Sequence, residues 1–332
     1  MDENRIVLAH GGGGALTREL IEEVILPALG TPVLSLPDAA PLPTMPDLLF
    51  TTDSFVVKPL FFRGGDIGSL SVHGTVNDLA VSGAEPLALS LSLIIEEGLD
   101  VDLLRRVMAS AAEAAQACGV SIVTGDTKVV PRGDADELFI TTAGVGARRL
   151  ESSPSQIHEG DRVLINGRIA EHGVAVMSER EGIEFETRVR SDSAPVWPFV
   201  HALIESGAEV HAMRDPTRGG LAACCVELAE DSGVTIALEE PAIPLQTEVL
   251  TACEVLGLDP LTVANEGKLV AFIHERDSER ALAAMRSTPG GEHAALIGEA
   301  VAKRAVPVVL HTRFGGERIV EMPYGEELPR IC

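Results

Sequence analysis

Residues 51–86 read TTDSFVVKPLFFRGGDIGSLSVHGTVNDLAVSGAEP. Apolar runs at residues 48–52 and 55–60 predict two strands around the start of this stretch. At its end, Pro86 leads into LALSLSLII, where Leu and Ser alternate with the period of two of a strand that has one wet or partner-facing side. Asp53, Asp66 and Asp78 lie between these runs, each beside Gly, Ser, Thr or Asn, which predicts loop contexts for them.

Strands and helices alternate downstream of this stretch. Asp100 can cap a helix over residues 101–118, whose apolar residues fall on one face and which Gly119 ends. SIVTG, residues 121–125, is typical of a buried strand that runs into a loop, and residues 137–150 are typical of a long strand. Residues 151–160 are polar and contain Ser, Pro and Gly, which predicts a domain boundary.

A second unit with strands and helices follows this boundary. We expect strands at residues 162–166, 269–274 and 306–310, and helices at residues 171–180 and 219–230. The chain is therefore predicted to be α/β (α+β), with four parts. These parts are a Gly-rich loop, amphipathic stretch and Pro-rich linker (1–46), an N-terminal domain (47–154), a C-terminal α/β domain (155–322) and a mobile tail (323–332).

The composition limits the possible partners. The 332 residues are 45% hydrophobic, which is typical of a globular chain, and the net charge of −24 makes nucleic acid and membrane surfaces unfavourable partners. The N-terminus lacks the pattern of a signal peptide, and no apolar run reaches the roughly 20 residues of a membrane span. The five cysteines have no disulfide or zinc-site spacing, so we expect reduced thiols in a cytoplasmic protein.

Two features could hold a nucleotide and its metal. The first is a run of glycines after His10, because glycines let backbone N–H groups approach phosphate oxygens. This run matches neither a Walker A loop nor a Rossmann fingerprint, and a flexible linker explains it equally well. The second is a set of aspartates, whose hard oxygens suit Mg²⁺, although any one of them could simply cap a helix or make a turn. The glycines are Gly11, Gly12, Gly13 and Gly14, and the aspartates are Asp53, Asp66, Asp78, Asp126 and Asp215.

Three further residues could carry chemistry. Lys128 follows GDT, which we interpret as a tight turn, and could reach a phosphate or a polarised carbonyl, or it is a solvated surface lysine. Glu266, in ANEGK, lies on a Gly-bounded loop and could act as a general base. Cys332 ends the chain in PRIC, where its thiol could enter a pocket of another protein or of its own.

Taken together, these motifs resemble the HypE family of hydrogenase maturation proteins, within the superfamily of aminoimidazole ribonucleotide synthetase, selenophosphate synthetase and thiamine-monophosphate kinase. The resemblance spans essentially the whole chain, in the family's order. TVNDLA is shared across the superfamily, whereas the terminal PRIC is specific to HypE. The matching pieces are HGGGG (10–14), the stretch 51–86, GDTKVV (126–131), MRDPTRGGLA (213–222), NEGK (265–268) and PRIC (329–332).

The resemblance implies a PurM-like fold of two domains, each a mixed or antiparallel sheet flanked by helices, with N-terminal domains paired in a homodimer. ATP would lie in a cleft between the domains and near the dimer interface. By the family's motifs, Asp53, Asp66, Asp78 and Asp215 would hold Mg²⁺ and phosphates, and Gly11 to Gly14 would close over them. Asn77, Asp126 and Thr127 would line the cleft, and Lys128 and Glu266 would lie where the substrate is activated.

The reaction that the resemblance implies is the ATP-dependent dehydration of an S-carbamoyl group on Cys332 to a thiocyanate. The carbamoyltransferase HypF would load the sulfur, and a HypC–HypD scaffold would receive the cyano group on iron for [NiFe]-hydrogenase. One alternative is a selenophosphate synthetase-like phosphotransferase, although residues 1–50 lack the cysteine it would need. The other is a nucleotide-binding scaffold whose tail is a docking peptide.

Overall fold

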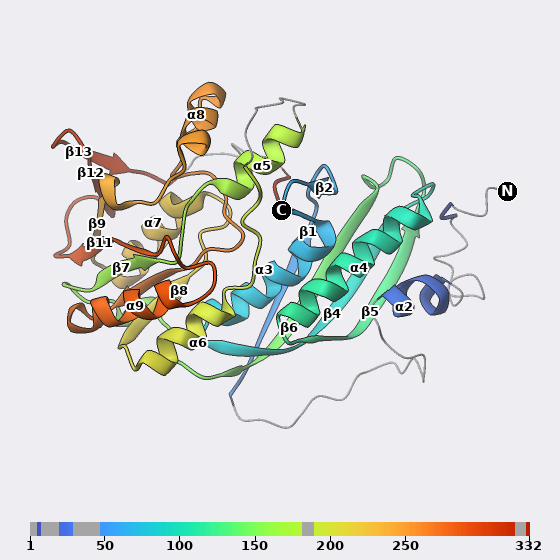
Figure 1. The fold of residues 1–332 in the computed structure, drawn as a ribbon, viewed down its shortest axis with the longest axis horizontal. Helices are drawn as coiled ribbons and strands as arrows, with labels where there is room; N and C mark the ends of the chain where they lie inside the picture. The colour runs from blue at the N-terminus through green and yellow to red at the C-terminus, as the bar shows by residue number, and fades with distance from the viewer. Residues whose placement is uncertain (1–4, 8–19, 29–46, 181–188, 323–329) are drawn as a thin grey trace.

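The computed structural model describes residues 5–7, 20–28, 47–180, 189–322 and 330–332. Two α/β halves lie side by side, each built on its own sheet, and the C-terminus lies between them (Figure 1). No helix within the described ranges has the length and apolar character that a membrane crossing requires. The predicted α/β architecture, with sheets flanked by helices, is confirmed.

The N-terminal half has a four-stranded sheet with the order β1-β6-β4-β5. Its pairs are antiparallel except for β4 and β5, which run parallel. In β4, Leu89, Leu91 and Leu93 are buried whereas Ser90 and Ser92 between them are half-buried, as the period of two predicted. The strands are β1 (Leu48–Phe55), β4 (Ala84–Glu96), β5 (Ser121–Val130) and β6 (Leu138–Arg148).

Two helices cover one face of this sheet, α3 (Ile67–Val81) and α4 (Val101–Ala117) (Figure 1). A short hairpin of β2 (Phe61–Phe62) and β3 (Gly65–Asp66) leads into α3. The predicted cap of α4 is confirmed, because the Asp100 carboxylate accepts hydrogen bonds from the first helical N–H groups. Cys118 caps the other end of α4, and Gly119 beyond it has the positive φ of 69° that ends the helix.

Three local predictions are wrong. Residues 56–60 form an irregular loop, so the strand expected at 55–60 is absent and β1 ends at Phe55. SIVTG is not a buried strand ending in a loop, because β5 continues through Val130 at the exposed edge of the sheet. Asp53 lies within β1 and Asp78 within α3, not in loops.

The C-terminal half has a seven-stranded sheet with the order β13-β12-β9-β11-β7-β10-β8, in which only β9 and β12 pair in parallel. Helices α5, α7 and α8 pack in one apolar cluster with this sheet, and α6 and α9 pack in another. The strands are β7 (Arg162–Ile165), β8 (Val210–Arg214), β9 (Thr235–Glu239), β10 (Val270–Ile273), β11 (Ala295–Val301), β12 (Val308–His311) and β13 (Glu317–Val320). The helices are α5 (Glu171–Arg180), α6 (Trp197–Ser206), α7 (Gly220–Ser232), α8 (Thr247–Leu256) and α9 (Ser278–Ser287), with short 3-10 turns at Pro154–Gln156, Glu240–Ala242 and Glu275–Asp277.

Helix α3 joins the two halves. Its residues from Ile67 to Val76 pack in the N-terminal core, whereas Ala80 and Val81 pack with the C-terminal sheet and α6. Upstream, a π-helical turn, Ile21–Ile25, continues into α2 (Leu26–Ala28), and Val24 is buried against the N-terminal core, as its amphipathic pattern predicted. Because α3 spans the junction, side chains on it can meet groups from both sheets.

Candidate functional site

Three of the predicted aspartates come together where the halves meet. Asp53 lies on β1, Asp78 on α3, and Asp215 directly after β8. Asp78 accepts a hydrogen bond of 2.9 Å from the Thr51 hydroxyl. Gly74 lets α3 approach β1 here, because a Cβ at this position would lie 2.8 Å from the Phe55 ring. Three elements that are distant in sequence therefore converge on one acidic cluster, which we define as Asp53, Asp78 and Asp215.

Electrostatics mark this acidic cluster as a place for a cation. Burial and the neighbouring Asp78 raise the pKa of Asp215 to about 7. Burial also raises the pKa of Asp78, and Asp53 adds to the effect, although Thr51, Arg214 and Arg218 oppose it. Carboxylates that repel one another in this way are stabilised in their charged form by a divalent ion, and carboxylate oxygens are the ligands that Mg²⁺ prefers. The residue type therefore suits the predicted metal, and the metal site itself stays a prediction.

Within the described part of the chain, no group of three or more His, Cys, Asp or Glu side chains is arranged to hold a metal ion by itself. Asp66 does not join the acidic cluster. Its carboxylate caps α3 by accepting hydrogen bonds from Gly68 and Ser69 N–H, and Ser69 returns a bond in a capping box. It lies at the opposite end of the helix from Asp78, about 18 Å along the axis. Its predicted role as a metal ligand remains a prediction.

Glu266 lies in a buried loop beside the acidic cluster. Glu266 is 3% exposed, and its Oε1 has no hydrogen-bond partner among the described residues. Burial raises the pKa of Glu266 well above its usual value, and Asp192, Asp215, Asp53 and Asp78 raise it further. A buried carboxyl with a free acceptor atom and a raised pKa is equipped to take up a proton.

Asp192, which the sequence analysis missed, holds the loop of Glu266. Its carboxylate accepts hydrogen bonds from the backbone N–H groups of Glu266 and Gly267 and pairs with Lys268 Nζ at 2.9 Å. Burial alone would raise the pKa of Asp192, but the Lys268 ammonium and the hydrogen bond from Glu266 N–H hold the pKa below the usual value. Gly267 is required here, because a Cβ would lie 1.9 Å from the Asp192 carbonyl oxygen. No local pattern marks Asp192, since its partners lie about 75 residues downstream.

Asn77 clamps the same loop from α3. Its amide nitrogen donates to the carbonyls of Ala194 and Glu266, each at 3.0 Å, and its oxygen accepts from Val196 N–H. Asn265 also holds the loop. Its side-chain oxygen accepts a hydrogen bond from Ala170 N–H, and its side-chain nitrogen donates to the carbonyl of Pro216, the residue next to Asp215. The Asn77 amide is therefore engaged in holding the loop, and the predicted place of Asn77 in an ATP-binding cleft stays a prediction.

Asp126, Thr127 and Lys128 lie away from the acidic cluster. All three are on β5, at the edge of the sheet opposite β1, and three strand spacings separate these edges by about 14 Å. The Lys128 ammonium contacts Asp126 at 3.2 Å, and both side chains are more than half exposed. GDT is part of the strand and not a tight turn, so Lys128 follows the strand direction along the edge. Gly11, Gly12, Gly13 and Gly14 lie outside the described residues.

The last three residues of the chain are docked in the junction. Val56 N–H donates to the Cys332 carbonyl at 3.1 Å, and Lys58 N–H donates to the Arg330 carbonyl at 3.3 Å. The Ile331 side chain is 2% exposed and packs in the N-terminal core. The Arg330 guanidinium pairs with Asp136 and donates to the Val56 carbonyl. Cys332 is thus placed next to the residues that follow β1, while the mobility predicted for residues 323–332 stays a prediction.

Comparison with known proteins agrees with this architecture. Two family models match, "AIR synthase related protein, N-terminal domain" over residues 37–147 and "AIR synthase related protein, C-terminal domain" over residues 158–311. The Rhodobacter capsulatus protein named carbamoyl dehydratase HypE is 47% identical over 336 residues, which cover 99% of each chain.

Two solved structures are also similar. A crystal structure of hydrogenase maturation protein HypE in complex with ATP superposes with a TM-score of 0.95 at 45% identity, covering 98% of this chain and 99% of that one. A chain in the crystal structure of a HypE–HypF complex superposes with a TM-score of 0.81 at 43% identity, covering 93% of this chain and 100% of that one.

Proposed function

Because this chain belongs to the HypE family of AIR synthase-related proteins, we propose that it is an ATP-dependent carbamoyl dehydratase whose substrate is carried on its own Cys332. The observation that carries the proposal is the docked terminus. The Cys332 carbonyl accepts a hydrogen bond from Val56 N–H. Val56 lies three residues, or about 10 Å of extended chain, beyond Asp53. The reactive sulfur and the acidic cluster therefore belong to one junction between the two halves.

The reaction proceeds from S–C(=O)–NH₂ on the Cys332 sulfur. The carbamoyl oxygen takes the γ-phosphoryl group of ATP, which releases ADP, and one N–H proton is lost. The C–O bond then breaks, hydrogen phosphate leaves with the second N–H proton, and S–C≡N remains. Phosphorylation is needed because an amide oxygen is a poor leaving group, and catalysis of this transfer relies on positioning and on stabilising the charge of the phosphoryl group.

The side chains have separate roles in this proposal. Asp53, Asp78 and Asp215 would hold Mg²⁺, which would balance the charge of the nucleotide phosphates. Glu266 takes the N–H proton, which requires its ionised form, and a cation bound at the acidic cluster lowers its raised pKa toward that form. Lys128 stabilises negative charge on the phosphorylated carbamoyl group. Glycines 11–14, Asn77, Asp126 and Thr127 complete the ATP-binding cleft.

A second copy of the chain explains the distance of Lys128 from the acidic cluster. On the sheet face that α3 and α4 leave uncovered, Phe50 is 70% exposed and Ile94 is 41% exposed. Apolar side chains of this size on an open sheet favour burial against another surface. We propose that two N-terminal sheets pair through this face in a homodimer, so that β5 of one protomer brings Asp126, Thr127 and Lys128 to the cleft of its partner.

Of the proposed partners, HypF is supported by a solved structure of a relative. A HypE–HypF complex has been crystallised for a relative, and we propose that a HypF carbamoyltransferase loads Cys332 of this chain. The cyano group then passes to iron on a HypC–HypD scaffold. The five cysteines form no disulfide among the described residues, which fits a reducing, cytoplasmic setting for this chemistry.

Mass spectrometry of the C-terminal peptide tests the function. Incubation with HypF and carbamoyl phosphate should add a carbamoyl group to Cys332, and subsequent ATP and Mg²⁺ should remove the mass of one water. A Cys332→Ser variant should show neither change. A nucleotide-binding scaffold with a docking tail predicts instead that no adduct forms and that Cys332→Ser still binds its partners.

A further inference from the structure

One side chain of the C-terminal half holds the docked terminus. His172, on α5, is fully buried, and its Nε2 lies 2.8 Å from the Ile331 carbonyl oxygen. Its Nδ1 lies 2.8 Å from the Ser191 hydroxyl. A carbonyl oxygen can only accept, so Nε2 must carry the proton and Nδ1 must accept from Ser191. Ser191 in turn accepts from Ser193 N–H at 3.1 Å. This chain of hydrogen bonds satisfies a neutral imidazole, and burial lowers the pKa of His172, which keeps the ring neutral.

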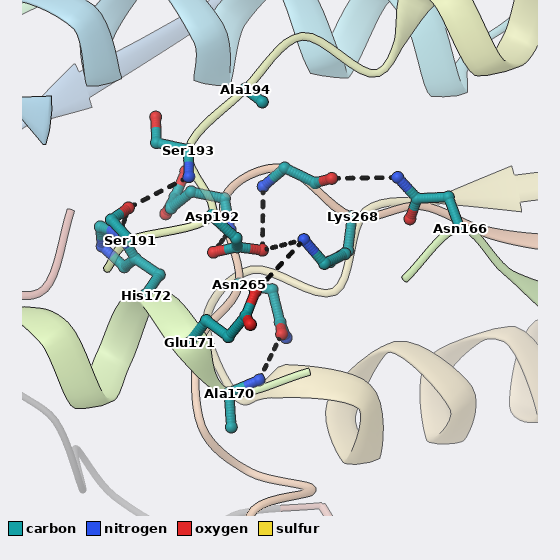
Figure 2. A network of polar contacts seen from close by, with 12 residues as sticks. Asn166, Ala170, Glu171, His172, Ser191, Asp192, Ser193, Ala194, Asn265 and Lys268 are labelled. Atoms are coloured by element: carbon teal, nitrogen blue, oxygen red, sulfur yellow. Dashed lines mark hydrogen bonds and ion pairs between the residues drawn. The ribbon is translucent and has the colours of Figure 1, made fainter. Parts of the chain in front are cut away.

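The segment that orients His172 also holds the loop of Glu266. Ser191 contacts the His172 ring. The carboxylate of the next residue, Asp192, accepts hydrogen bonds from the backbone N–H groups of Glu266 and Gly267. The Ala194 carbonyl accepts a hydrogen bond from the side-chain amide nitrogen of Asn77. Figure 2 shows His172 and Ser191 on one side of Asp192 and Lys268 on the other. Four consecutive residues, 191–194, therefore contact both the residue that grips the terminus and the loop that carries the candidate base.

The ring of His172 has little freedom to move. Both nitrogens are bonded, and the Phe62 ring packs edge-on against it with the centroids 5.4 Å apart. Its hydrogen bond reaches the carbonyl of the residue directly before Cys332, so the position of the ring limits where the sulfur can lie. A donor that is rigid, buried and one residue from the reacting group has the geometry of a positioning residue.

We propose that His172 is a positioning residue that fixes the terminal peptide through the Ile331 carbonyl, and that residues 191–194 set its ring in register with the Glu266 loop. The proposal rests on the proposed function insofar as Cys332 carries the substrate. His172 contacts no reacting atom. It acts through the backbone, so the sulfur and the candidate base are held by one continuous set of hydrogen bonds.

Alkylation of Cys332 tests the docking without any nucleotide or carbamoyl donor. Iodoacetamide labelling of the full chain, followed by mass spectrometry of the terminal peptide, measures how often the thiol is released, and the half-buried Cys118 serves as the internal reference. His172→Phe keeps a ring but removes the donor, and should raise the ratio of Cys332 to Cys118 labelling by about tenfold. His172→Gln places an amide donor near the position of Nε2. Its ratio of Cys332 to Cys118 labelling should therefore stay within about twofold of the ratio in the unaltered chain.

A matched control separates this role from general loosening. His73 bonds the Ser193 hydroxyl and does not contact the terminus, so His73→Gln should leave Cys332 labelling unchanged. Equal labelling of His172→Phe and the unaltered chain would overturn the proposal, and so would an equal rise in all three variants.

A second measurement connects docking to chemistry. After loading of Cys332, His172→Phe should slow the ATP-dependent loss of water by about tenfold while ATP affinity is unchanged, and His172→Gln should restore the rate. An unchanged rate in His172→Phe would contradict the positioning role. If no water is lost even from the unaltered chain, the proposed function fails, whereas the labelling result still decides whether His172 holds the terminus.

Discussion

The acidic cluster and the β5 edge each hold three of the predicted site residues, in contrasting environments. Asp53, Asp78 and Asp215 converge from three elements beside the buried Glu266, and their charges raise its pKa. Asp126 and Lys128 pair with each other on an exposed edge strand. Buried carboxylates that repel one another need a cation or a proton, whereas an exposed pair is largely screened by water. The contrast supports the proposal made above, in which one protomer supplies the metal and base side of the site and its partner supplies the lysine side.

The largest expected effect is at Glu266. Glu266→Gln keeps the shape of the side chain but removes the proton acceptor, and should slow the loss of water from loaded Cys332 by about a hundredfold or more. Single-turnover mass spectrometry measures this rate, and ATP affinity should be unchanged. A rate within about threefold of the unaltered chain would remove Glu266 from the list of bases.

Mixed dimers test whether Lys128 acts across the interface. Glu266→Gln and Lys128→Ala should each be inactive as homodimers. After the two are unfolded together and refolded, half of the dimers are mixed and each of these has one complete site if Lys128 acts in its partner, so about a quarter of the activity should return. If Lys128 acts within its own chain, every site carries one of the two changes and no activity returns.

The buried and exposed acids should also differ in their effect on stability. Asp192→Asn leaves Lys268 without its main partner at a side-chain exposure of 10%, and should lower the free energy of unfolding by about 3 kcal/mol. Asp126→Asn, at the exposed edge, should change it by less than about 0.5 kcal/mol. Urea unfolding followed by circular dichroism measures both, and equal losses would contradict the assigned burial.

The smallest effect concerns pH. The pKa of Asp215 is raised to about 7, so its carboxyl is protonated below this pH and must lose the proton before it binds Mg²⁺. Mg²⁺ affinity, measured by titration calorimetry, should therefore fall by about tenfold between pH 8 and pH 6 and level off above pH 7.5.

The stability of the folded chain should depend on pH in the opposite direction to Mg²⁺ affinity. The raised pKa means that the folded chain binds a proton more tightly than the unfolded chain, so the contribution of Asp215 to stability is lost as the pH rises through about 7. Asp215→Asn should make both Mg²⁺ affinity and folding stability less dependent on pH. If either dependence persists in this variant, another group causes it.

The parts of the fold that sequence predicted are those with local signals. Helix α4 has an apolar face, an aspartate cap and a terminal glycine, and all three appear as expected. Helix α3 gave no such pattern because it is buried on almost every side, with Thr75 and Asn77 inside as well as Leu70. A helix without a polar face has no amphipathic period, so Asp78 was assigned to a loop.

Candidate site residues that belong to a sequence motif could be predicted. Those that reach the site only through tertiary contacts could not. Glu266 was found from NEGK, and its neighbour Lys268 stood in the same motif without a role. Asp192 and His172 were missed because their partners, the Glu266 loop and Ile331, are far away in sequence. Edge position in a sheet depends on strand order, so the apolar residues of SIVTG (121–125) cannot by themselves distinguish an exposed edge strand from a buried one.

The fate of the carbamoyl oxygen decides whether this chain dehydrates a carbamoyl group on Cys332. Cys332 would be loaded with a carbamoyl group carrying a heavy-oxygen label, and ATP and Mg²⁺ then added. We expect the label to appear in inorganic phosphate as the terminal peptide becomes a thiocyanate, because the carbamoyl oxygen is the atom that is phosphorylated. Label that remains on the peptide or is released in water, with none in phosphate, would contradict it.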